Sequence, residues 1–348
     1  GDEGGGGGEG GPVKVPEIAG AEQDAYAQKV ADLGLVPKVK KVFDESDAGT
    51  LFRVDPKENT EVEPGSAVTL FVSGGFPQLA FDNGKDILLA NGTDGKPLDP
   101  IAKGAQDEHD PTWSPDGSAI AFTSDGQVFL SNRAKPEDPP RPLSAEGETY
   151  SDLAWAPTTD ANVLAMAKKT DSASDLCFGR IDAKGMETRC KDEPETVIER
   201  KINWAPDGKS ILAFGFNPET TQFGMVQWKT KKPFSSNPDD YSKGEIVTDT
   251  SKPGEGVLDA AISPDGKRMA VVNRGPNGRG ELFMAKRGDF LLADAKRLGV
   301  RACKVIWRPD GQDLVVVQAD DCVGAQTGDL VRLPVADPKE QQQLKLGG

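Results

Sequence analysis

The sequence contains a single histidine, His109, and none of its four cysteines lies in a Cys-x-x-Cys pair. A Ser-His-Asp triad needs a histidine and a histidine-rich metal site needs several, so we expect His109 in a surface loop rather than at a catalytic centre. The Gly-x-Ser-x-Gly elbow of α/β-hydrolases is also missing. We therefore expect no catalytic residues, no metal and no cofactor in this chain.

Positive charge and long apolar runs are scarce as well. The formal net charge is −15 at pH 7, whereas binding to nucleic-acid phosphates requires a basic surface. The longest apolar stretches, such as Leu314 to Val317, fall far short of the roughly 20 residues that a membrane span needs. We expect no nucleic-acid partner, no membrane insertion by this chain, and a monomer.

Aromatic residues make up only 6% of the chain, while 40 glycines and 26 prolines indicate frequent tight turns. Residues 1–11 are almost entirely glycine and acidic residues, which predicts a disordered linker because such a segment has no apolar surface to bury. The sequence therefore reads as beginning inside a flexible linker. We expect the protein to be tethered by a transmembrane helix that lies outside it.

Residues 12–75 show the pattern of a small α+β domain. Tyr26, Val30 and Leu33 form one apolar face of a short helix, and Gly34 stands where a glycine would end that helix. Alternating runs at 36–43, 49–54 and 67–72 predict strands.

The same segment resembles a PASTA domain along its whole length. The resemblance rests on the ordered elements Val15-Pro16, Gly20, the helix, Gly34-Leu35, Gly49-Thr50, Asp55-Pro56, Gly65-Ser66-Ala67-Val68 and Val72-Ser73-Gly74. It departs where the family places a glycine after the Pro56 turn, because Asn59 stands nearest that position; asparagine tolerates the left-handed conformation. PASTA domains are typical of the outer regions of bacterial Ser/Thr kinases and penicillin-binding proteins. The resemblance implies either a domain that binds a peptidoglycan fragment or one that acts only as a spacer.

A turn repeat begins after residue 76. Its five aligned copies are Trp113-Ser-Pro-Asp-Gly117, Trp155-Ala-Pro-Thr-Thr159, Trp204-Ala-Pro-Asp-Gly208, Ile262-Ser-Pro-Asp-Gly266 and Trp307-Arg-Pro-Asp-Gly311. Pro, Asp and Gly in this order favour a hairpin turn. We expect the repeated tryptophan to pack between neighbouring repeats.

Each turn is followed by a short apolar strand, and Leu79-Ala80-Phe81 adds a sixth copy. Successive strands are 41 to 57 residues apart, a spacing typical of four-stranded propeller blades. Residues 76–348 therefore resemble a TolB-like six-bladed β-propeller, which makes the chain mainly β. The first blade enters at its second strand. Its missing first strand would have to come from residues 341–346 or from the segment that joins the two domains.

The cysteines predict two disulfides and hence an oxidising compartment. A two-residue hairpin loop at Ala183-Lys184 places Cys177 opposite Cys190 at a non-hydrogen-bonded pair, where Cα atoms are closest. Cys303 and Cys322 bracket the first hairpin of the sixth repeat and could likewise meet. Two buried free thiol pairs in a cytosolic protein are the alternative.

One offset in the repeat is always charged. Three residues before each aligned Trp or Ile stand Asp110, Asp152, Lys201, Asp259 and Lys304. Because the first strand of every blade lies nearest the axis, we expect these residues to form a ring at the channel mouth. Two lysines among three acids exclude a metal and leave two readings, Asp–Lys pairs of structural value only or a mouth for a zwitterionic or peptide-like ligand.

Together these patterns predict a binding protein of the cell envelope, outside the cytoplasm. The first hypothesis is a sensor region of a PASTA-type Ser/Thr kinase, associated with the cell wall through peptidoglycan fragments. Since the kinase signatures are absent here, a kinase domain would lie upstream. The alternative is a TolB-like scaffold for protein–protein interactions with no kinase attached.

Overall fold

The computed structural model divides the chain into two compact units, residues 1–77 and 78–348. The residues it describes are 11–42, 46, 49–75, 78–83, 85–102, 107–133, 135–157, 162–170, 174–191, 197–217, 222–235, 237, 240–247, 256–275, 279–287, 295–320, 322 and 328–344. Residues 1–10 of the predicted linker lie outside them.

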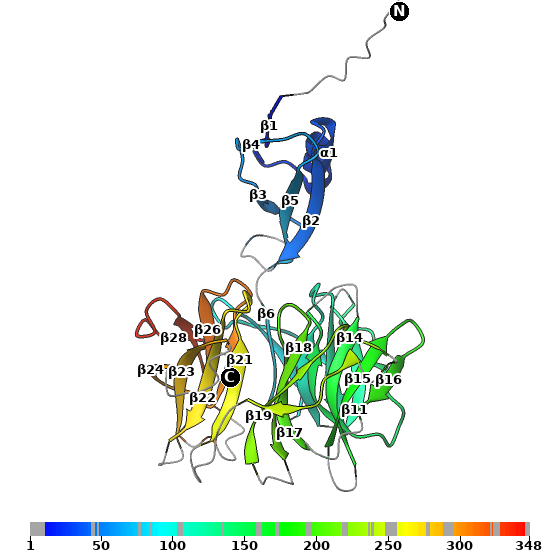
Figure 1. Cartoon of the computed structure of the whole chain (residues 1–348), viewed down its shortest axis with the longest axis vertical. Helices are drawn as coiled ribbons and strands as arrows, with labels where there is room; N and C mark the ends of the chain where they lie inside the picture. The colour runs from blue at the N-terminus through cyan, green and yellow to red at the C-terminus, as the bar shows by residue number, and fades with distance from the viewer. Residues whose placement is uncertain are drawn as a thin grey trace, which may run out of the picture. The chain divides into compact units, whose positions relative to one another are not determined.

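The first unit packs one helix against a small mixed sheet (Figure 1). Its elements are β1 (Val13–Lys14), α1 (Gln23–Asp32), β2 (Val36–Val42), β3 (Leu51–Asp55), β4 (Glu61–Val62) and β5 (Ala67–Ser73). β5 pairs in parallel with β2 and antiparallel with β3. Tyr26 and Val30 of the helix are fully buried in one cluster with Val68 and Leu70 of β5, as the sequence predicted. The third predicted residue of that face, Leu33, is wrong, because α1 ends at Asp32 and Leu33 is 39% exposed.

Two turns of the first unit need left-handed backbone. Gly34 has a φ of +75° just after α1, and Asn59 has a φ of +64° in the turn before β4. Asparagine is one of the few side-chain-bearing residues that adopt this conformation readily. The departure at Asn59 therefore preserves the turn.

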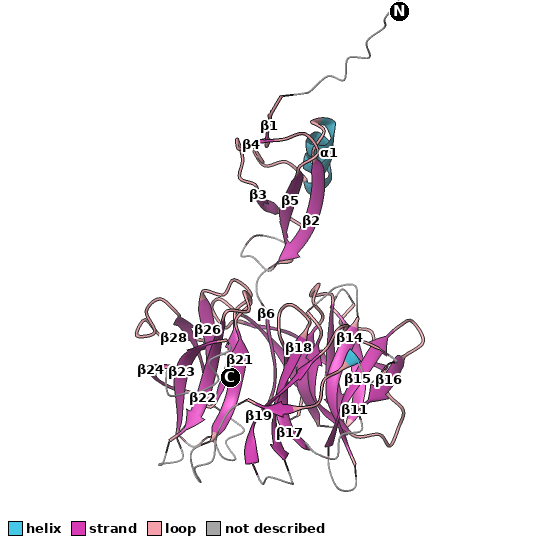
Figure 2. Ribbon diagram, in the orientation of Figure 1, coloured by secondary structure: helices cyan, strands magenta, loops and turns pink. Residues whose placement is uncertain are grey.

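The described residues of the second unit form six antiparallel sheets, five of four strands and one of three, and Figure 2 shows these strands. Blades 1 to 3 are β6 (Gln78–Asp82), β7 (Ile87–Asn91), β8 (Pro97–Ala102); β9 (Glu108–Trp113), β10 (Ala119–Ser124), β11 (Gln127–Asn132), β12 (Arg141–Pro142); β13 (Tyr150–Trp155), β14 (Val163–Lys169), β15 (Ser174–Ile181), β16 (Met186–Cys190). Blades 4 to 6 are β17 (Val197–Trp204), β18 (Ser210–Asn217), β19 (Gln222–Lys229), β20 (Glu245–Ile246); β21 (Val257–Ile262), β22 (Arg268–Arg274), β23 (Gly280–Lys286), β24 (Lys296–Arg301); β25 (Lys304–Trp307), β26 (Asp313–Gln318), β27 (Asp329–Pro334), β28 (Gln342–Gln343).

Blade 1 begins at the second-strand position. The backbone N–H of Glu108, at the start of β9, donates to the carbonyl of Lys85 in the β6–β7 turn at 3.0 Å. The equivalent bond one blade later runs from Tyr150 to Gly126, in the β10–β11 turn, at 2.8 Å. β6 therefore corresponds to β10, and within the described residues blade 1 has no first strand. Residues 342–343 do not supply one, because they form β28, which pairs with β27 as the outer strand of blade 6. Residues 345–346 of the predicted closing segment and residues 76–77 of the joining segment lie outside the described residues.

Apolar clusters fill the spaces between neighbouring blades, and the repeated tryptophans belong to them. Trp204 is 8% exposed, and its indole N–H donates to the carbonyl of Ala154 in the preceding blade at 3.1 Å. Trp307 makes the same bond to Ala261 at 2.8 Å. Trp204 and Trp307 thus pack in inter-blade clusters, and each fixes the spacing of two inner strands.

The Pro-Asp-Gly turns have the conformation that their sequence predicts. In the last of them, Gly311 has a φ of +69° and donates its N–H to the carbonyl of Arg308 at 2.9 Å. The carboxylate of Asp310 accepts the next backbone N–H at 2.8 Å. In the turn before it, the Ser263 hydroxyl donates to Asp265 and holds the pKa of that carboxyl below its ordinary value.

Replacing Gly311 with alanine should destabilise the propeller. The new Cβ would meet only ordinary van der Waals contacts, so the cost comes from the left-handed backbone, about 1–2 kcal/mol. Gly256→Ala is the matched control, because the φ of Gly256 lies outside the left-handed region and no heavy atom lies within 4 Å of the position of an added Cβ. Thermal unfolding should show a lower Tm for Gly311→Ala only; equal Tm values for the two variants would contradict the assignment.

Candidate functional site

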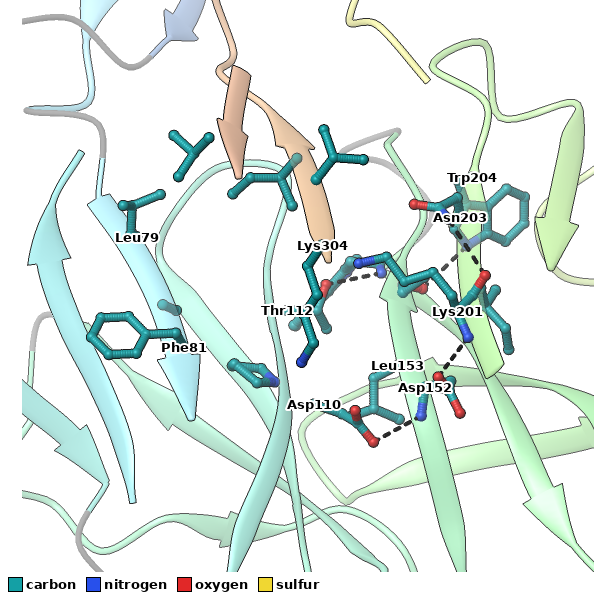
Figure 3. A pocket seen from close by; sticks show the side chains of 18 of the residues that line it. Leu79, Phe81, Asp110, Thr112, Asp152, Leu153, Lys201, Asn203, Trp204 and Lys304 are labelled. Carbon is teal, nitrogen blue, oxygen red and sulfur yellow. Dashed lines mark hydrogen bonds between the residues drawn. The ribbon is translucent and has the colours of Figure 1, made fainter. Parts of the chain in front are cut away.

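A cavity of about 740 Å³ occupies the middle of the propeller. Its wall contains prolines of all five aligned turns, Pro115, Pro157, Pro206, Pro264 and Pro309. Four of the five charged residues that the sequence singled out also line it, namely Asp110, Asp152, Lys201 and Lys304 (Figure 3). Trp155 and Trp204 contribute to the wall in addition to packing between blades. Four of the five inner strands, β9, β13, β17 and β25, therefore line the cavity.

The charged residues are joined mainly through backbone rather than by Asp–Lys pairing. The carboxylate of Asp110 accepts the backbone N–H of Asp152 in the next blade at 2.9 Å, and the carboxylate of Asp152 accepts that of Lys201 at 2.6 Å (Figure 3). The ammonium group of Lys201 lies 3.4 Å from the carboxylate of Asp259. These contacts link Asp110, Asp152, Lys201 and Asp259 in sequence from blade 2 to blade 5. We call this set of contacts the inter-blade relay.

A β-bulge produces this geometry in three successive blades. At Asp110, Asp152 and Lys201 two residues of the inner strand face one residue of its neighbour. All three have a left-handed φ, between +54° and +57°. The bulge takes the backbone N–H out of its own sheet, so that the N–H can bond to the neighbouring blade.

Asp259 is the exception, and its expected place at the channel mouth is wrong. It is 2% exposed and does not line the cavity. The register shift of blade 5 falls between Val257 and Asp259, one residue earlier than in the other blades. The side chain of Asp259 is consequently buried between blades, where it accepts the backbone N–H of Val305 at 2.8 Å. The inter-blade relay therefore reaches blade 6 through Asp259.

The cavity also includes residues that the charged repeat does not identify. Asp82, at the end of β6, lines it and lies 3.5 Å from the imidazole of His109. His109 belongs to β9, so the expected surface loop is wrong, although its side chain is 46% exposed. Burial, followed by the negative charges of Asp152 and Asp82, raises the pKa of Asp110 above its ordinary value. This part of the cavity wall is acidic.

Lys304 is placed differently from the other charged residues. Its side chain extends into the cavity toward the side where Asp110 lies (Figure 3). No acid among the described residues lies within ion-pair distance of its ammonium group. Lys304 therefore brings an uncompensated positive charge to the cavity, at the same offset at which Lys201 contacts Asp259.

Both cysteine pairs form disulfides. Cys177 lies opposite Cys190 in the β15–β16 ladder, with Cα atoms 3.9 Å apart, as the hairpin register predicts. Cys303 and Cys322 are joined with Cα atoms 5.0 Å apart. Two intact disulfides are typical of proteins outside the cytoplasm.

Two further findings concern metals and membranes. Within the part of the chain that the structure describes, no group of three or more His, Cys, Asp or Glu side chains is placed to hold a metal ion. No described helix is both long and apolar enough to cross a bilayer.

Comparison with known proteins supports the same division of the chain. Residues 13–74 match the PASTA domain family. A stretch of 73 residues, 20% of the chain, is 40% identical to a probable serine/threonine-protein kinase of Clostridium perfringens, and 251 residues, 68% of the chain, are 25% identical to the serine/threonine-protein kinase PrkC of Bacillus subtilis. These matches span only 10% and 36% of the two kinases. The first unit is a PASTA domain.

The second unit resembles solved propellers in fold. TolB from Acinetobacter baumannii has a TM-score of 0.55 at 14% identity, over 77% of this chain and 63% of that one. A provisionally assigned TolB from Agrobacterium tumefaciens gives 0.51 at 17% identity, over 71% and 83%. The chain therefore combines a PASTA domain with a TolB-like six-bladed propeller, and the PASTA domain and the disulfides indicate an extracytoplasmic region.

Asp152→Ala should weaken the propeller more than Asp152→Asn. Alanine leaves the backbone N–H of Lys201 without its acceptor, which costs about 1–3 kcal/mol, whereas asparagine retains a carbonyl oxygen there. Urea unfolding of both variants measures the difference. Equal losses of stability would show that the contact does not hold blades 3 and 4 together.

Asp110→Asn should change how stability depends on pH. Because the folded-state pKa of Asp110 is raised, ionising this carboxyl disfavours the folded state, and that penalty appears as pH rises from the ordinary aspartate value through the folded pKa. Asparagine cannot ionise. The stability of Asp110→Asn relative to the parent should therefore increase from about pH 4 to pH 7 in urea titrations; a constant difference would contradict the raised pKa.

Proposed function

We propose that this chain is the extracytoplasmic ligand-binding region of a PASTA-type Ser/Thr kinase, that it senses peptidoglycan fragments, and that a transmembrane helix outside this sequence tethers it. The observation that carries the proposal is the PASTA domain at residues 13–74, together with similarity to two Ser/Thr kinases. In this proposal the chain binds and does not catalyse. The carboxylates of Asp152 and Asp259 support that role, because both accept backbone N–H groups of neighbouring blades.

The propeller adds a second binding surface to the PASTA domain. Its cavity presents acids at Asp82 and Asp110 and a free cation at Lys304. A mixed-charge wall of this kind suits a ligand that carries both charges, such as a peptide. The PASTA domain would then hold the protein at the wall while the propeller recognises a different molecule.

A second candidate function is a TolB-like scaffold for protein–protein interactions with no kinase attached. The large cavity and the fold favour it, because propellers of this size offer a broad concave surface. The two candidates differ in what the PASTA domain does, since a scaffold does not require a wall ligand.

Sedimentation with purified peptidoglycan distinguishes them. We expect the whole chain and a fragment of residues 11–77 to co-sediment with the wall material, and a fragment of residues 78–348 to stay in the supernatant. Soluble muropeptide should release the bound protein. Circular dichroism of each fragment serves as the folding control. If the whole chain stays in the supernatant, wall binding is wrong and the scaffold is favoured.

A further inference from the structure

Within the described residues, the innermost position of blade 1 is open. Each of the other five blades has a first strand, and four of these strands, β9, β13, β17 and β25, line the cavity, whereas blade 5 contributes Pro264 from the turn after β21. Blade 1 instead presents β6, a second strand, to the cavity. Within the described residues no strand lies beside β6 on the side away from β7. One edge of this sheet therefore faces the cavity.

The exposed edge has backbone groups available for pairing. The N–H of Asn83 donates a hydrogen bond to the carbonyl of Asp86, at the turn end of the β6–β7 ladder. This bond fixes which residue pairs of the ladder are hydrogen-bonded to each other and which are not. Counting back from it, the N–H and C=O of Ala80 point away from β7, and they make no hydrogen bond to any described residue. A strand edge with unpaired groups is a template for another strand.

The space beside β6 is apolar. Leu79 and Phe81 of β6 form one wall (Figure 3), and Val315 and Leu330 of blade 6 line the cavity too. Ile306 on β25 also lines it and is 42% exposed, a large share for an apolar residue on an inner strand. A strand placed here would bury apolar side chains, which is a main source of binding free energy.

The direction of such a strand follows from β6. β6 ends at Asp82, beside His109 at the start of β9, so β6 and β9 run in opposite directions. A strand in the vacant position would pair antiparallel with β6, as β9 pairs with β10. It would therefore begin at the charged end of the cavity.

The inter-blade relay indicates which kind of residue the added strand needs at the charged end of the cavity. In blade 5, Asp259 receives the ammonium group of Lys201 from blade 4 and the backbone N–H of Val305 from blade 6. Lys304 stands at the same offset as Lys201, and the blade that follows it in the ring is blade 1. An acid at the start of the added strand would meet Lys304 as Asp259 meets Lys201.

Among the residues that the structure describes, no segment is left to fill this place. Residues 342–343 are already paired in blade 6, residues 345–348 are only Lys-Leu-Gly-Gly, and residues 1–10 contain no apolar side chain. A second copy would have to give up one of its own inner strands. Lys304 and the apolar wall instead define the occupant by complementarity, as a strand that carries an acid and apolar side chains, and we assign this strand to a partner protein.

We propose that the inner edge of β6 binds an extended segment of a partner protein, with an aspartate or glutamate followed by apolar residues, as the first strand of blade 1. The observed inner strands β13 and β25 contain 6 and 4 residues, which sets the length of the segment. This binding mode is strand addition, and it does not depend on the binding of peptidoglycan by the PASTA domain.

A peptide with the sequence of residues 256–263, labelled with fluorescein, is the probe, because it carries an inner strand with the acid at the required offset. Fluorescence anisotropy with the whole chain should show saturable binding. Lys304→Glu should weaken it at least about fivefold. The probe with lysine in place of its aspartate should bind Lys304→Glu better than it binds the parent. Lys296→Glu, on an exposed part of β24, is the control and should bind like the parent.

Methylation of the peptide backbone tests strand pairing separately from charge. N-methyl groups at every second residue should abolish binding when they occupy the amides that face β6, and should have little effect at the alternate residues. Sensitivity that does not alternate, or equal binding to Lys304→Glu and the parent, would overturn the proposal.

Hydrogen exchange of the Ala80 amide identifies the occupant. We expect rapid exchange in the free protein and protection when the probe is added. Protection in the free protein that does not change with concentration would assign the edge to this chain itself, and protection that rises with protein concentration would assign it to a second copy. Either result would overturn the assignment to a partner.

Discussion

The arrangement of the propeller depends on hydrogen bonds that a side chain on one inner strand accepts from the backbone of the next. Among the described residues, neighbouring blades share no strand ladder, and apolar packing between blades has little directional preference. The N–H of Asp152 donates to the carboxylate of Asp110, and the N–H of Lys201 donates to the carboxylate of Asp152. These directional bonds orient neighbouring blades relative to each other. They lie at the cavity wall, partly shielded from water, where such bonds are strengthened.

The left-handed backbone at Asp110, Asp152 and Lys201 belongs to the same set of inter-blade contacts. A left-handed aspartate or lysine costs of the order of 1 kcal/mol or more, and the cost recurs in three blades. At Asp152 and Lys201 the cost is offset because the bulge turns the backbone N–H toward a carboxylate acceptor in the preceding blade. In blade 5 the bulge falls one residue earlier, so Asp259 bridges Lys201 and Val305 with its side chain.

Sequence patterns predicted the features that repeat within a blade. The Pro-Asp-Gly turns, the six sheets and the opposition of Cys177 to Cys190 follow from local geometry and hairpin register. The same patterns misplaced Asp259 and His109, and they did not predict how the charged residues of neighbouring blades meet. Those features depend on non-glycine residues with positive φ and on contacts between blades. Strict alternation along a strand cannot reveal an inserted bulge residue.

The open position in blade 1 connects the relay to the cavity. Each lysine of the charged offset has no side-chain oxygen and cannot accept a backbone N–H, so it can continue the relay only by donating to an acid on the following blade. Lys201 finds Asp259 there. Lys304 precedes, in the ring, the blade that has no first strand among the described residues, and its charge is left in the cavity. An added strand that carries an acid would join blade 6 to blade 1 and close the ring, so that occupation of one edge strengthens the connection among all six blades.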